Sequence, residues 1–328
     1  MKIAVFSTKS YDKEYLNQVN TSHELIFFET SLNINTANLT QGFNAVCVFV
    51  NDKIDAAIID KLAANRIQII ALRCAGFNNV DLVAAAAKNI KVVRVPSYSP
   101  QAVAEHTVAL ILTLNRKTHK VYNRVRESNF SLERLIGFNL YQKTVGVIGT
   151  GQIGKAFCNI MLGFGCKIIA YDVQECETLK NQGVTYLSFD EVLQQSDIIS
   201  LHCPLITQTH HIINGESLAK MKQGVMLINT SRGGLIKTTD VIEALKSGHL
   251  GYLGIDVYEQ EEHLFFKDLS ESVIQDDAIE RLMSFHNVLI TPHQGFFTKE
   301  ALEQIATTTL NNLTSFEKGL PLQNQVLA

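Results

Sequence analysis

Short apolar runs alternate with helix-forming segments along almost the whole chain, and this alternation constrains the fold more than any other feature. In the first third, candidate helices such as 55–65 and 81–89 separate the apolar runs. Strands that are apolar throughout are buried on both faces, which is typical of a parallel sheet covered by helices on each side. We therefore expect strands at 3–6, 25–28, 45–50, 67–72 and 92–95.

A second series of the same kind follows a long helical pattern. The helix is predicted to begin at Ser99-Pro100, because serine is a good N-cap and proline suits the first helical position. Its apolar stripe continues to Tyr122. The second series of strands is predicted at 144–148, 167–171, 198–202, 225–229, 252–256 and 288–291.

These two series predict two doubly wound α/β domains with a boundary near residue 100. A last helix is predicted from about Thr298, a plausible N-cap, to about Glu317. Periodicity alone leaves open which of the two domains this helix packs on.

Composition excludes several classes of protein. The 328 residues carry 29 basic and 32 acidic side chains, and this net charge of −3 does not favour nucleic acid as a partner. No apolar run approaches the length of a membrane span, and the first apolar stretch is too short for a signal peptide, so the cytosol is the expected location. The six cysteines are scattered, which predicts free thiols and no metal site.

The segment GTGQIG at 149–154 is a G-x-G-x-x-G motif, directly after the strand at 144–148 and directly before a helical pattern. Gly149 permits a tight turn, Gly151 lets the backbone approach a pyrophosphate, and Gly154 lets the helix pack close to the strand. The helix N-terminus then offers N–H groups to the phosphates. Glycine-rich turns are common, but this strand–turn–helix context predicts a dinucleotide-binding site.

Asp172 follows the next strand, 172 − 149 = 23 residues after the first glycine. That separation is near the one expected for the acid that binds an adenosine ribose, although an isolated loop carboxylate would also fit. A carboxylate accepts hydrogen bonds from a ribose 2′-hydroxyl but repels a 2′-phosphate. No arginine occurs among the next three residues, so NAD is predicted rather than NADP.

An arginine, a carboxylate and a histidine follow three later strands of the second series. They are Arg232, Glu261 and His293. Because ligands in open α/β sheets bind beyond the carboxyl ends of the strands, we expect the three side chains to converge near the cofactor. Taken singly, each has a simpler interpretation as a solvated charge or a packing histidine.

Together the three residues provide what the reduction of a 2-keto acid needs. Arg232 can hold the substrate carboxylate with two parallel N–H donors and polarise the carbonyl. His293 can give a proton to the developing alkoxide, and it becomes the base in the reverse direction. Glu261 can orient the imidazole and favour its protonated form.

The sequence resembles the D-isomer-specific 2-hydroxyacid dehydrogenase family over essentially its whole length. Within the family it looks closest to the D-lactate dehydrogenases of fermentative bacteria, particularly over 264–277. The matching motifs are RCAGFNNVD at 73–81, VPSYSP at 95–100, AEH at 104–106, the glycine loop at 149–154, LHCPL at 201–205, NTSRG at 229–233, DVYE at 256–259 and TPH at 291–293.

The resemblance implies two interleaved domains with a cleft between them that closes over substrate. The substrate domain, flavodoxin-like, would comprise 1–100 plus 298–328, and the NAD-binding Rossmann domain would comprise 101–297. Arg232, Glu261 and His293 match the catalytic residues of the family. The implied reaction is reversible hydride transfer between NADH and pyruvate, giving D-lactate. A homo-oligomer, dimer or tetramer, is implied as well, commonly formed through the coenzyme domain.

The resemblance also assigns binding residues. The family usually has a basic residue or histidine where this chain has Gln152, so the affinity for NAD is expected to differ. The implied contacts are the pyrophosphate with the backbone of Gln152 and Ile153, the adenosine side with Cys203, Pro204 and Thr209, the nicotinamide with Thr230, Ser231 and Asp256, the substrate carboxylate with backbone N–H groups of Gly76 and Phe77, and a small pocket closed by Tyr98 and Phe296.

Two alternatives stay open from the sequence. The same chemistry could act on a bulkier or different acid, such as phenylpyruvate, 2-ketoisocaproate or glyoxylate, since one methylene in an apolar pocket is worth only about 1–3 kcal/mol. A non-catalytic NAD-sensing protein would keep the same fold. Such a protein would bind NADH and consume none of it.

Overall fold

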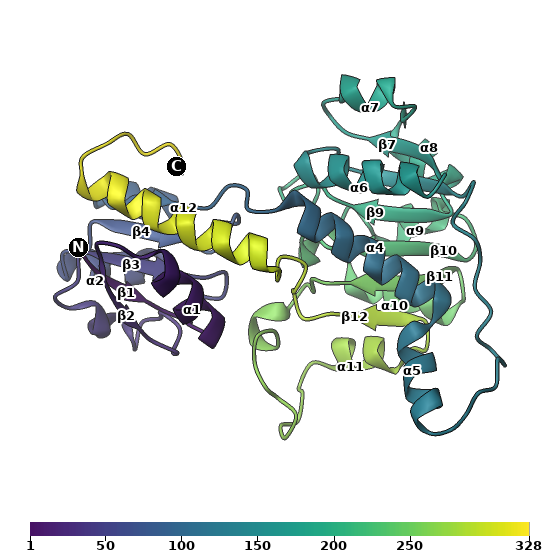
Figure 1. Ribbon diagram of the computed structural model, residues 1–328, viewed down its shortest axis with the longest axis horizontal. Coiled ribbons are helices and arrows are strands. Elements are labelled where there is room, and N and C mark those ends of the chain that lie inside the picture. The colour runs from purple at the N-terminus through teal and green to yellow at the C-terminus, as the bar shows by residue number, and fades with distance from the viewer. Residues whose placement is uncertain (328) are drawn as a thin grey trace. The chain divides into compact units, whose positions relative to one another are not determined.

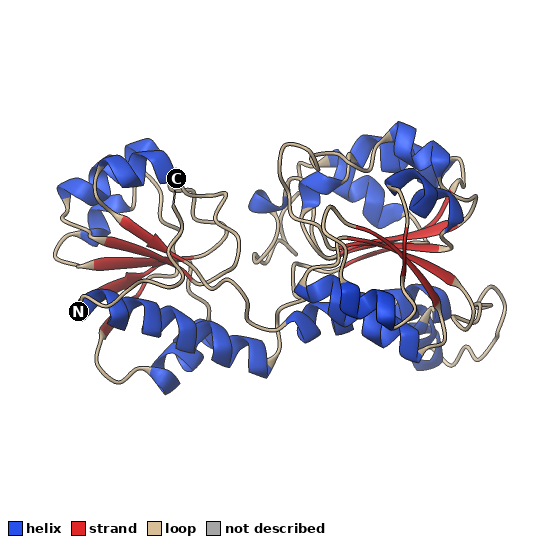
Figure 2. Cartoon of the chain, turned by 90° about the horizontal axis from the view of Figure 1, so that it is seen from above, coloured by secondary structure: helices blue, strands red, loops and turns tan. Residues whose placement is uncertain are grey.

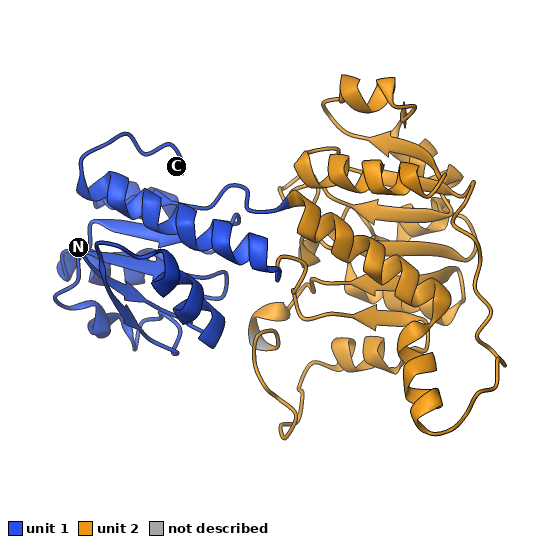
Figure 3. Ribbon diagram, in the orientation of Figure 1, with its two compact units in different colours: residues 1–99, 297–328 blue, residues 100–296 orange. Residues whose placement is uncertain are grey.

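The computed structural model describes residues 1–327, apart from the side chain of His263, and it divides the chain into two compact units (Figure 3). Unit 1 combines Met1–Ser99 with the chain from Phe297 onward, and unit 2 is the continuous stretch Pro100–Phe296. None of the described helices is both long and apolar enough to cross a membrane.

Unit 1 is built around a five-stranded parallel sheet with the strand order β2-β1-β3-β4-β5. Its strands are β1 (Lys2–Val5), β2 (Glu24–Phe27), β3 (Ala45–Val48), β4 (Ile69–Leu72) and β5 (Lys91–Val93). Its helices are α1 (Ser10–Val19), α2 (Ala56–Ala64), α3 (Leu82–Ala87) and α12 (Lys299–Glu317), with a 3₁₀ turn at Ala37–Thr40.

Helices cover both faces of this sheet (Figure 2). On one face, Leu310 and Leu313 of α12 pack with Leu16 of α1 against the strands. On the other face, α2 and α3 contribute to a second apolar cluster. Helix α12 begins where predicted, because the Thr298 hydroxyl accepts the backbone N–H of Ala301. The structure thus assigns the last helix to unit 1.

Unit 2 contains a seven-stranded parallel sheet with the order β12-β11-β10-β9-β6-β7-β8 (Figure 1). Its strands are β6 (Thr144–Ile148), β7 (Lys167–Tyr171), β8 (Thr185–Tyr186), β9 (Ile198–Leu201), β10 (Val225–Asn229), β11 (Leu250–Ile255) and β12 (Val288–Ile290). Its helices are α4 (Pro100–Arg116), α5 (Thr118–Arg126), α6 (Gln152–Gly163), α7 (Glu177–Asn181), α8 (Phe189–Gln195), α9 (Gly215–Lys220), α10 (Thr238–Lys246) and α11 (Asp277–Ser284), with 3₁₀ turns at Gly233–Leu235 and Glu261–His263.

The order of strands in unit 2 reverses at β6. The chain runs from β6 to β7 and β8 on one side, and then returns to β9 on the other side of β6. Helices α4, α6 and α7 bury their apolar residues on one face of the sheet, and α8 to α11 bury theirs on the other. In such sheets a ligand binds beyond the carboxyl ends of the strands at the reversal, here between β6 and β9.

The predicted fold class is confirmed, and a strand lies at every place where one was predicted, with ends shifted by at most two residues. Strand β8 was missed because it has only two residues. The single long helix predicted from Ser99-Pro100 through Tyr122 was wrong. It is two helices, α4 and α5, because Lys117 between them has a left-handed backbone with φ of 52°. Tyr122 is 62% exposed and belongs to no buried stripe.

Candidate active site

The glycine loop after β6 is held by contacts that leave no room for larger residues. Gly149 has φ of 93°, and a Cβ there would lie 2.6 Å from the backbone nitrogen of Cys203, which follows β9. A Cβ on Gly154 would lie 2.0 Å from the carbonyl oxygen of Gly149. These two glycines let the loop, the end of β9 and helix α6 approach one another closely.

Gly151 has a different environment. It is the N-cap of α6, and a Cβ built on it would meet no atom within 4 Å. The open space lies at the N-terminus of α6, where the first N–H groups of a helix lack acceptors within the helix and the helix dipole is positive. Gln152 and Ile153 form the first turn of α6. This arrangement fits a pyrophosphate group.

Asp172 lies directly after β7 and its carboxylate is held by backbone and side-chain donors. Oδ2 accepts the backbone N–H of Thr150 at 2.5 Å and the Thr150 hydroxyl at 3.1 Å. Oδ1 accepts the backbone N–H of Gln174 at 3.0 Å. The residue between the first two glycines therefore joins the glycine loop to the carboxylate, although the sequence motif treats that position as variable.

The loop after β9 contains three residues predicted to contact the adenosine side. Cys203 is buried, and its carbonyl oxygen accepts the Ser231 hydroxyl at 2.7 Å. The Thr209 hydroxyl donates to the carbonyl oxygen of Pro204 at 2.6 Å. The loops after β9 and β10 are thus tied together beside the glycine loop.

The loop after β10 is organised by Asn229, which the sequence analysis placed in a motif but gave no role. Asn229 is fully buried, its side-chain nitrogen donates to the carbonyl oxygen of Arg232 at 2.9 Å, and its oxygen accepts the Ser231 N–H at 3.0 Å. The Thr230 hydroxyl pairs with that of Thr107 on α4 at 2.8 Å. The available signal was a polar residue that ends an otherwise apolar strand.

Arg232 is half-buried and its guanidinium makes no ion pair with any residue that the structure describes. Its Nη1 donates to the carbonyl oxygen of Ser231 at 2.7 Å. A Cβ on the next residue, Gly233, would lie 2.1 Å from the carbonyl carbon of Tyr258, so the turn after Arg232 packs directly on the segment that leads to Glu261. A half-buried arginine without a carboxylate partner can bind an anionic ligand.

His293 and Glu261 form a hydrogen-bonded pair. The distance from His293 Nδ1 to Glu261 Oε1 is 2.8 Å, and Glu261 Oε2 accepts the backbone N–H of Tyr258 at 2.9 Å. A carboxylate can only accept, so Nδ1 carries the proton of this bond and Nε2 is the atom available for chemistry. The histidine side chain is 16% exposed, and its ring lies beside that of Phe266.

The backbone that carries His293 is fixed by Asp256. His293 has φ of 56°, a conformation that non-glycine residues rarely adopt without support. Asp256, buried at the end of β11, accepts the Thr291 hydroxyl at 2.5 Å and the backbone N–H groups of Gln294 and Gly295 at 2.8 Å each. The carboxylate therefore clamps the turn on both sides of the histidine.

His106 on α4 completes this clamp. Its Nε2 lies 3.3 Å from Asp256 Oδ1 and 3.0 Å from the Thr291 hydroxyl. Burial acts to raise the pKa of Asp256, but hydrogen bonds from His106 and Thr291 and the charge of nearby histidines outweigh it and lower that pKa. Asp256 thus stays ionised and keeps its acceptors for the turn. The sequence analysis placed His106 in a motif but gave it no role.

The remaining predicted substrate residues lie elsewhere. Gly76 and Phe77 follow β4 in unit 1, and this loop is held by Arg94, whose guanidinium donates to the Ala75 carbonyl and lies over the Phe77 ring. Tyr98 is half-buried near the end of Met1–Ser99, the first chain segment of unit 1. Phe296, the last residue of unit 2, is buried.

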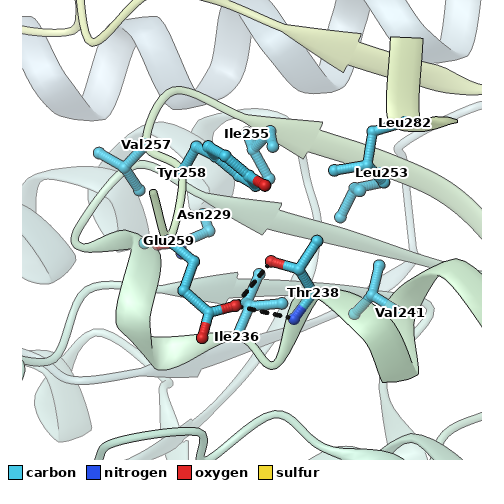
Figure 4. Close-up of a pocket in the computed structure, with 11 residues that line it drawn as sticks. Asn229, Ile236, Thr238, Val241, Leu253, Ile255, Val257, Tyr258, Glu259 and Leu282 are labelled. Atoms are coloured by element: carbon cyan, nitrogen blue, oxygen red, sulfur yellow. Dashed lines mark hydrogen bonds between the residues drawn. The ribbon is translucent and has the colours of Figure 1, made fainter. Parts of the chain in front are cut away.

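A small pocket in unit 2 is separate from these residues (Figure 4). Most of its lining is apolar and comes from β11, α10, α11 and the loops that follow β10 and β11. On its polar side, Glu259 accepts the hydroxyl and backbone N–H of Thr238, and it also pairs with His211 at 2.6 Å. Neither Glu261 nor His293 lines this pocket, so we attribute it to packing between the sheet and α10.

Comparison with known proteins defines the class of this chain. The family model "D-isomer specific 2-hydroxyacid dehydrogenase, NAD binding domain" matches residues 108–295, which lie within unit 2. A D-lactate dehydrogenase from Escherichia coli K12 is 51% identical over 100% of both chains. A "2-hydroxyacid dehydrogenase homolog" from Haemophilus influenzae is 53% identical over 100% of this chain and 99% of its own. The apo-structure of the Escherichia coli D-lactate dehydrogenase matches with a TM-score of 0.92 at 48% identity, covering 100% of both chains.

The chain belongs to the D-isomer-specific 2-hydroxyacid dehydrogenase family. The predictions of the family and of NAD as the cofactor are thereby confirmed. Among the described residues, no group of three histidine, cysteine, aspartate or glutamate side chains is placed to hold a metal ion.

Proposed function

We propose that this protein is an NAD-dependent D-lactate dehydrogenase that interconverts pyruvate and D-lactate. The observation that carries the proposal is the His293–Glu261 pair, held by the Asp256 clamp in the same unit as the glycine loop. The choice of D-lactate is supported by full-length identity of 51% to a protein of that name.

Arg232 is proposed to bind the substrate carboxylate. Its guanidinium has no carboxylate partner among the described side chains, so binding an anion costs no existing ion pair. Two parallel N–H donors fix the plane of a 2-keto acid and place its carbonyl beside the carboxylate contact. NADH, when bound, supplies the hydride.

His293 is proposed to provide the proton. In reduction, its Nε2–H donates to the oxygen of the carbonyl as negative charge develops there. In oxidation, Nε2 accepts the hydroxyl proton of the D-2-hydroxy acid. Glu261 holds Nδ1–H in both directions, so the ring keeps one orientation while Nε2 gains or loses its proton.

The proposed coenzyme contacts use hydrogen-bond acceptors of the site that other protein groups leave open. Asp256 Oδ1 is occupied by Thr291, Gln294 and His106, whereas among the described residues Oδ2 accepts only the backbone N–H of Gly295. Oδ2 therefore has an acceptor position for the carboxamide of the nicotinamide. Thr230 and Ser231 would contact the same ring, and Asp172 would accept a ribose hydroxyl. The assignments of Gly76, Phe77, Tyr98 and Phe296 to the substrate, and of Cys203, Pro204 and Thr209 to the adenosine side, stay predictions.

The test is the oxidation of NADH with pyruvate, phenylpyruvate, 2-ketoisocaproate and glyoxylate in parallel, with the chirality of the product determined. Rapid conversion of pyruvate to D-lactate, with slower turnover of the bulkier acids, supports the proposal. A preference for phenylpyruvate or 2-ketoisocaproate would refute the D-lactate assignment and leave the family unchanged. NADH binding without turnover of any acid would favour an NAD-sensing protein.

A histidine variant separates catalysis from binding. His293→Ala is expected to lower kcat strongly and to leave NADH binding nearly unchanged, because the proton transfer occurs only in the transition state. Wild-type kcat in this variant would show that His293 is not the proton donor.

We also propose a homo-oligomer formed through unit 2. Several large apolar side chains are exposed between the end of α4 and the start of β6, and a contact with a second copy would bury them. They are Tyr122, Val125, Phe130, Leu132, Ile136 and Tyr141. Light scattering is expected to show a dimer or tetramer that Ile136→Asp dissociates, whereas Val273→Asp, an exposed apolar site elsewhere in unit 2, leaves it intact. A monomeric wild-type protein would refute this.

A cytosolic location is part of the same proposal. All six cysteines are free thiols in the structure, and five of them are buried. Free thiols are maintained in a reducing compartment. Fractionation of cells that produce the protein is the direct measurement.

A further inference from the structure

A relay of hydroxyl groups leads from β8 to Asp172, and the reaction chemistry does not account for it. The backbone N–H of Cys176 donates to the Tyr186 hydroxyl oxygen at 3.0 Å, and Tyr186 lies 2.9 Å from Thr150 Oγ1. Thr150 Oγ1 in turn lies 3.1 Å from Asp172 Oδ2. An ionised carboxylate can only accept, so the Thr150 proton goes to Asp172 and the Tyr186 proton goes to Thr150.

The relay leaves Asp172 with little acceptor capacity. Oδ2 accepts both the backbone N–H and the hydroxyl of Thr150, which fills its two lone pairs. Oδ1 accepts the Gln174 N–H and keeps one lone pair. A ribose hydroxyl would therefore meet one open acceptor on a carboxylate that is already held at three points.

The sheet explains why Tyr186 reaches this place. In the parallel pairing of β7 with β8, Tyr186 is opposite Ala170, two residues before Asp172. Its hydroxyl contacts Cys176 at the far end of the turn that Asp172 begins, and Thr150 in the glycine loop. Thr150 is buried, with 7% of its surface exposed, so water cannot easily replace these bonds.

We propose that Thr150 and Tyr186 are positioning residues that set the preference for NAD over NADP by holding the Asp172 carboxylate in one orientation. The inference rests on the proposed role of Asp172 as the acceptor of the adenosine ribose. A carboxylate that can rotate turns away from a 2′-phosphate, and the repulsion weakens. Held by Thr150, and through Thr150 by Tyr186, the carboxylate cannot turn without breaking hydrogen bonds to a charged group.

The experiment measures the dissociation constants of NADH and NADPH directly by titration calorimetry, together with the thermal unfolding of each variant. Thr150→Val keeps the shape of the side chain and removes the hydroxyl, whereas Thr150→Ser keeps the hydroxyl. We expect Thr150→Val to weaken NADH about fivefold without weakening NADPH, since one hydrogen bond to a charged group is lost. Thr150→Ser is expected to retain the wild-type preference.

Tyr186→Phe tests the next link of the relay. It is expected to lower the preference for NADH over NADPH about two- to threefold. The effect is smaller than in Thr150→Val because the variant removes the hydrogen bond from Tyr186 to Thr150 but keeps the one from Thr150 to Asp172. The matched control is Tyr252→Phe, a strand tyrosine of unit 2 whose ring packs on Phe138 and whose hydroxyl makes no hydrogen bond to a described residue. The control should keep the wild-type preference.

A double-mutant cycle distinguishes positioning from general stabilisation. With Asp172→Ala as the background, Tyr186→Phe should change neither affinity further, because its effect acts through the carboxylate. The inference would be overturned if Thr150→Val left the preference for NADH over NADPH unchanged, for example by weakening both coenzymes equally. If Asp172→Ala lowered that preference in the same experiment, the proposed role of Asp172 would remain. An unchanged ratio in Asp172→Ala itself would overturn both. If Tyr186→Phe does not fold, the comparison of Thr150→Val with Thr150→Ser tests the inference by itself.

Discussion

Replacement of Glu261 by glutamine would test the histidine pair without changing its shape. Glu261 Oε1 lies 2.8 Å from His293 Nδ1, and Oε2 accepts the Tyr258 N–H at 2.9 Å. Since the Tyr258 N–H can only donate, the glutamine oxygen must face it, and the glutamine NH₂ group must face Nδ1. Nδ1 then becomes an acceptor, the ring proton moves to Nε2, and the negative charge beside the ring is lost.

The expected loss follows from that hydrogen bond. A bond to a charged group contributes about 1.5–3 kcal/mol, and about 1.4 kcal/mol corresponds to a factor of ten in rate. We therefore expect kcat/KM for pyruvate to fall roughly 10- to 150-fold with NADH affinity unchanged. Because the overall equilibrium is fixed, kcat/KM for D-lactate must fall by the same factor when the coenzyme affinities do not change.

The assay is steady-state turnover in both directions, with NADH binding measured separately. Glu262→Gln is the matched control, since it removes the same charge from an exposed neighbouring residue and should stay within about twofold of wild type. A decrease of less than about threefold in Glu261→Gln, in both directions, would refute the argument from the ring proton.

Three further outcomes follow from the structure. Arg232→Lys should raise the KM for pyruvate more than tenfold, a loss of roughly 1.4 kcal/mol or more in binding free energy, because an ammonium cannot offer two parallel donors. An unchanged KM in steady-state assays would refute the proposed contact of Arg232 with the substrate carboxylate. Gly154→Ala should lower the melting temperature sharply, since the added carbon would lie 2.0 Å from the Gly149 carbonyl oxygen. Gly151→Ala should keep a melting temperature near that of the wild type and bind NADH more weakly. Equal melting temperatures of the two variants would contradict this. Burial lowers the pKa of His202 from 6.5 to about 3, so between these pH values the unfolded chain binds one more proton than the folded chain, and stability falls as the pH drops. His202→Gln should reduce the fall in melting temperature over this pH range. The same pH dependence in the variant and the wild type would be evidence against this role of His202.

Much of the sheet and the glycine loop could be predicted because local chemistry determines them. The strand Val225–Asn229 is buried along its whole length, and its apolar run has no other stable place in a domain of this kind. Gly149 and Gly154 are needed wherever a strand, a turn and a helix approach this closely. In such segments the sequence pattern and the packing carry the same information.

The break between α4 and α5 could not be predicted, since no glycine or proline marks it. Contacts from a distant loop hold the break at Lys117. The side chain of Asn115 pairs with both backbone groups of Phe138, and Lys117 Nζ donates to the carbonyl oxygen of Ile136 at 2.5 Å. These partners are about twenty residues away, so helical periodicity gives no sign of them.

The residues that position the site were missed for the same reason. His106 and Thr291 meet although 185 residues separate them, and Tyr186 reaches Thr150 across 36 residues. The sequence identifies the residues that we propose for the chemistry because their types are specific to it. Their supporting hydroxyl and imidazole groups have no distinctive type or spacing and become visible only when the sheet brings the strand ends together.

The division of unit 1 between the two ends of the chain affects how the protein is made. Unit 2 is continuous and has all its strands once residue 296 has left the ribosome. The sheet of unit 1 is synthesised first, yet Leu310 and Leu313, which cover one of its apolar faces, are synthesised almost last. Until α12 is made, that face is covered by α1 but not by α12. A nascent chain stalled before α12 would therefore combine a folded coenzyme-binding unit with a partly exposed apolar sheet, which attracts chaperones or aggregates.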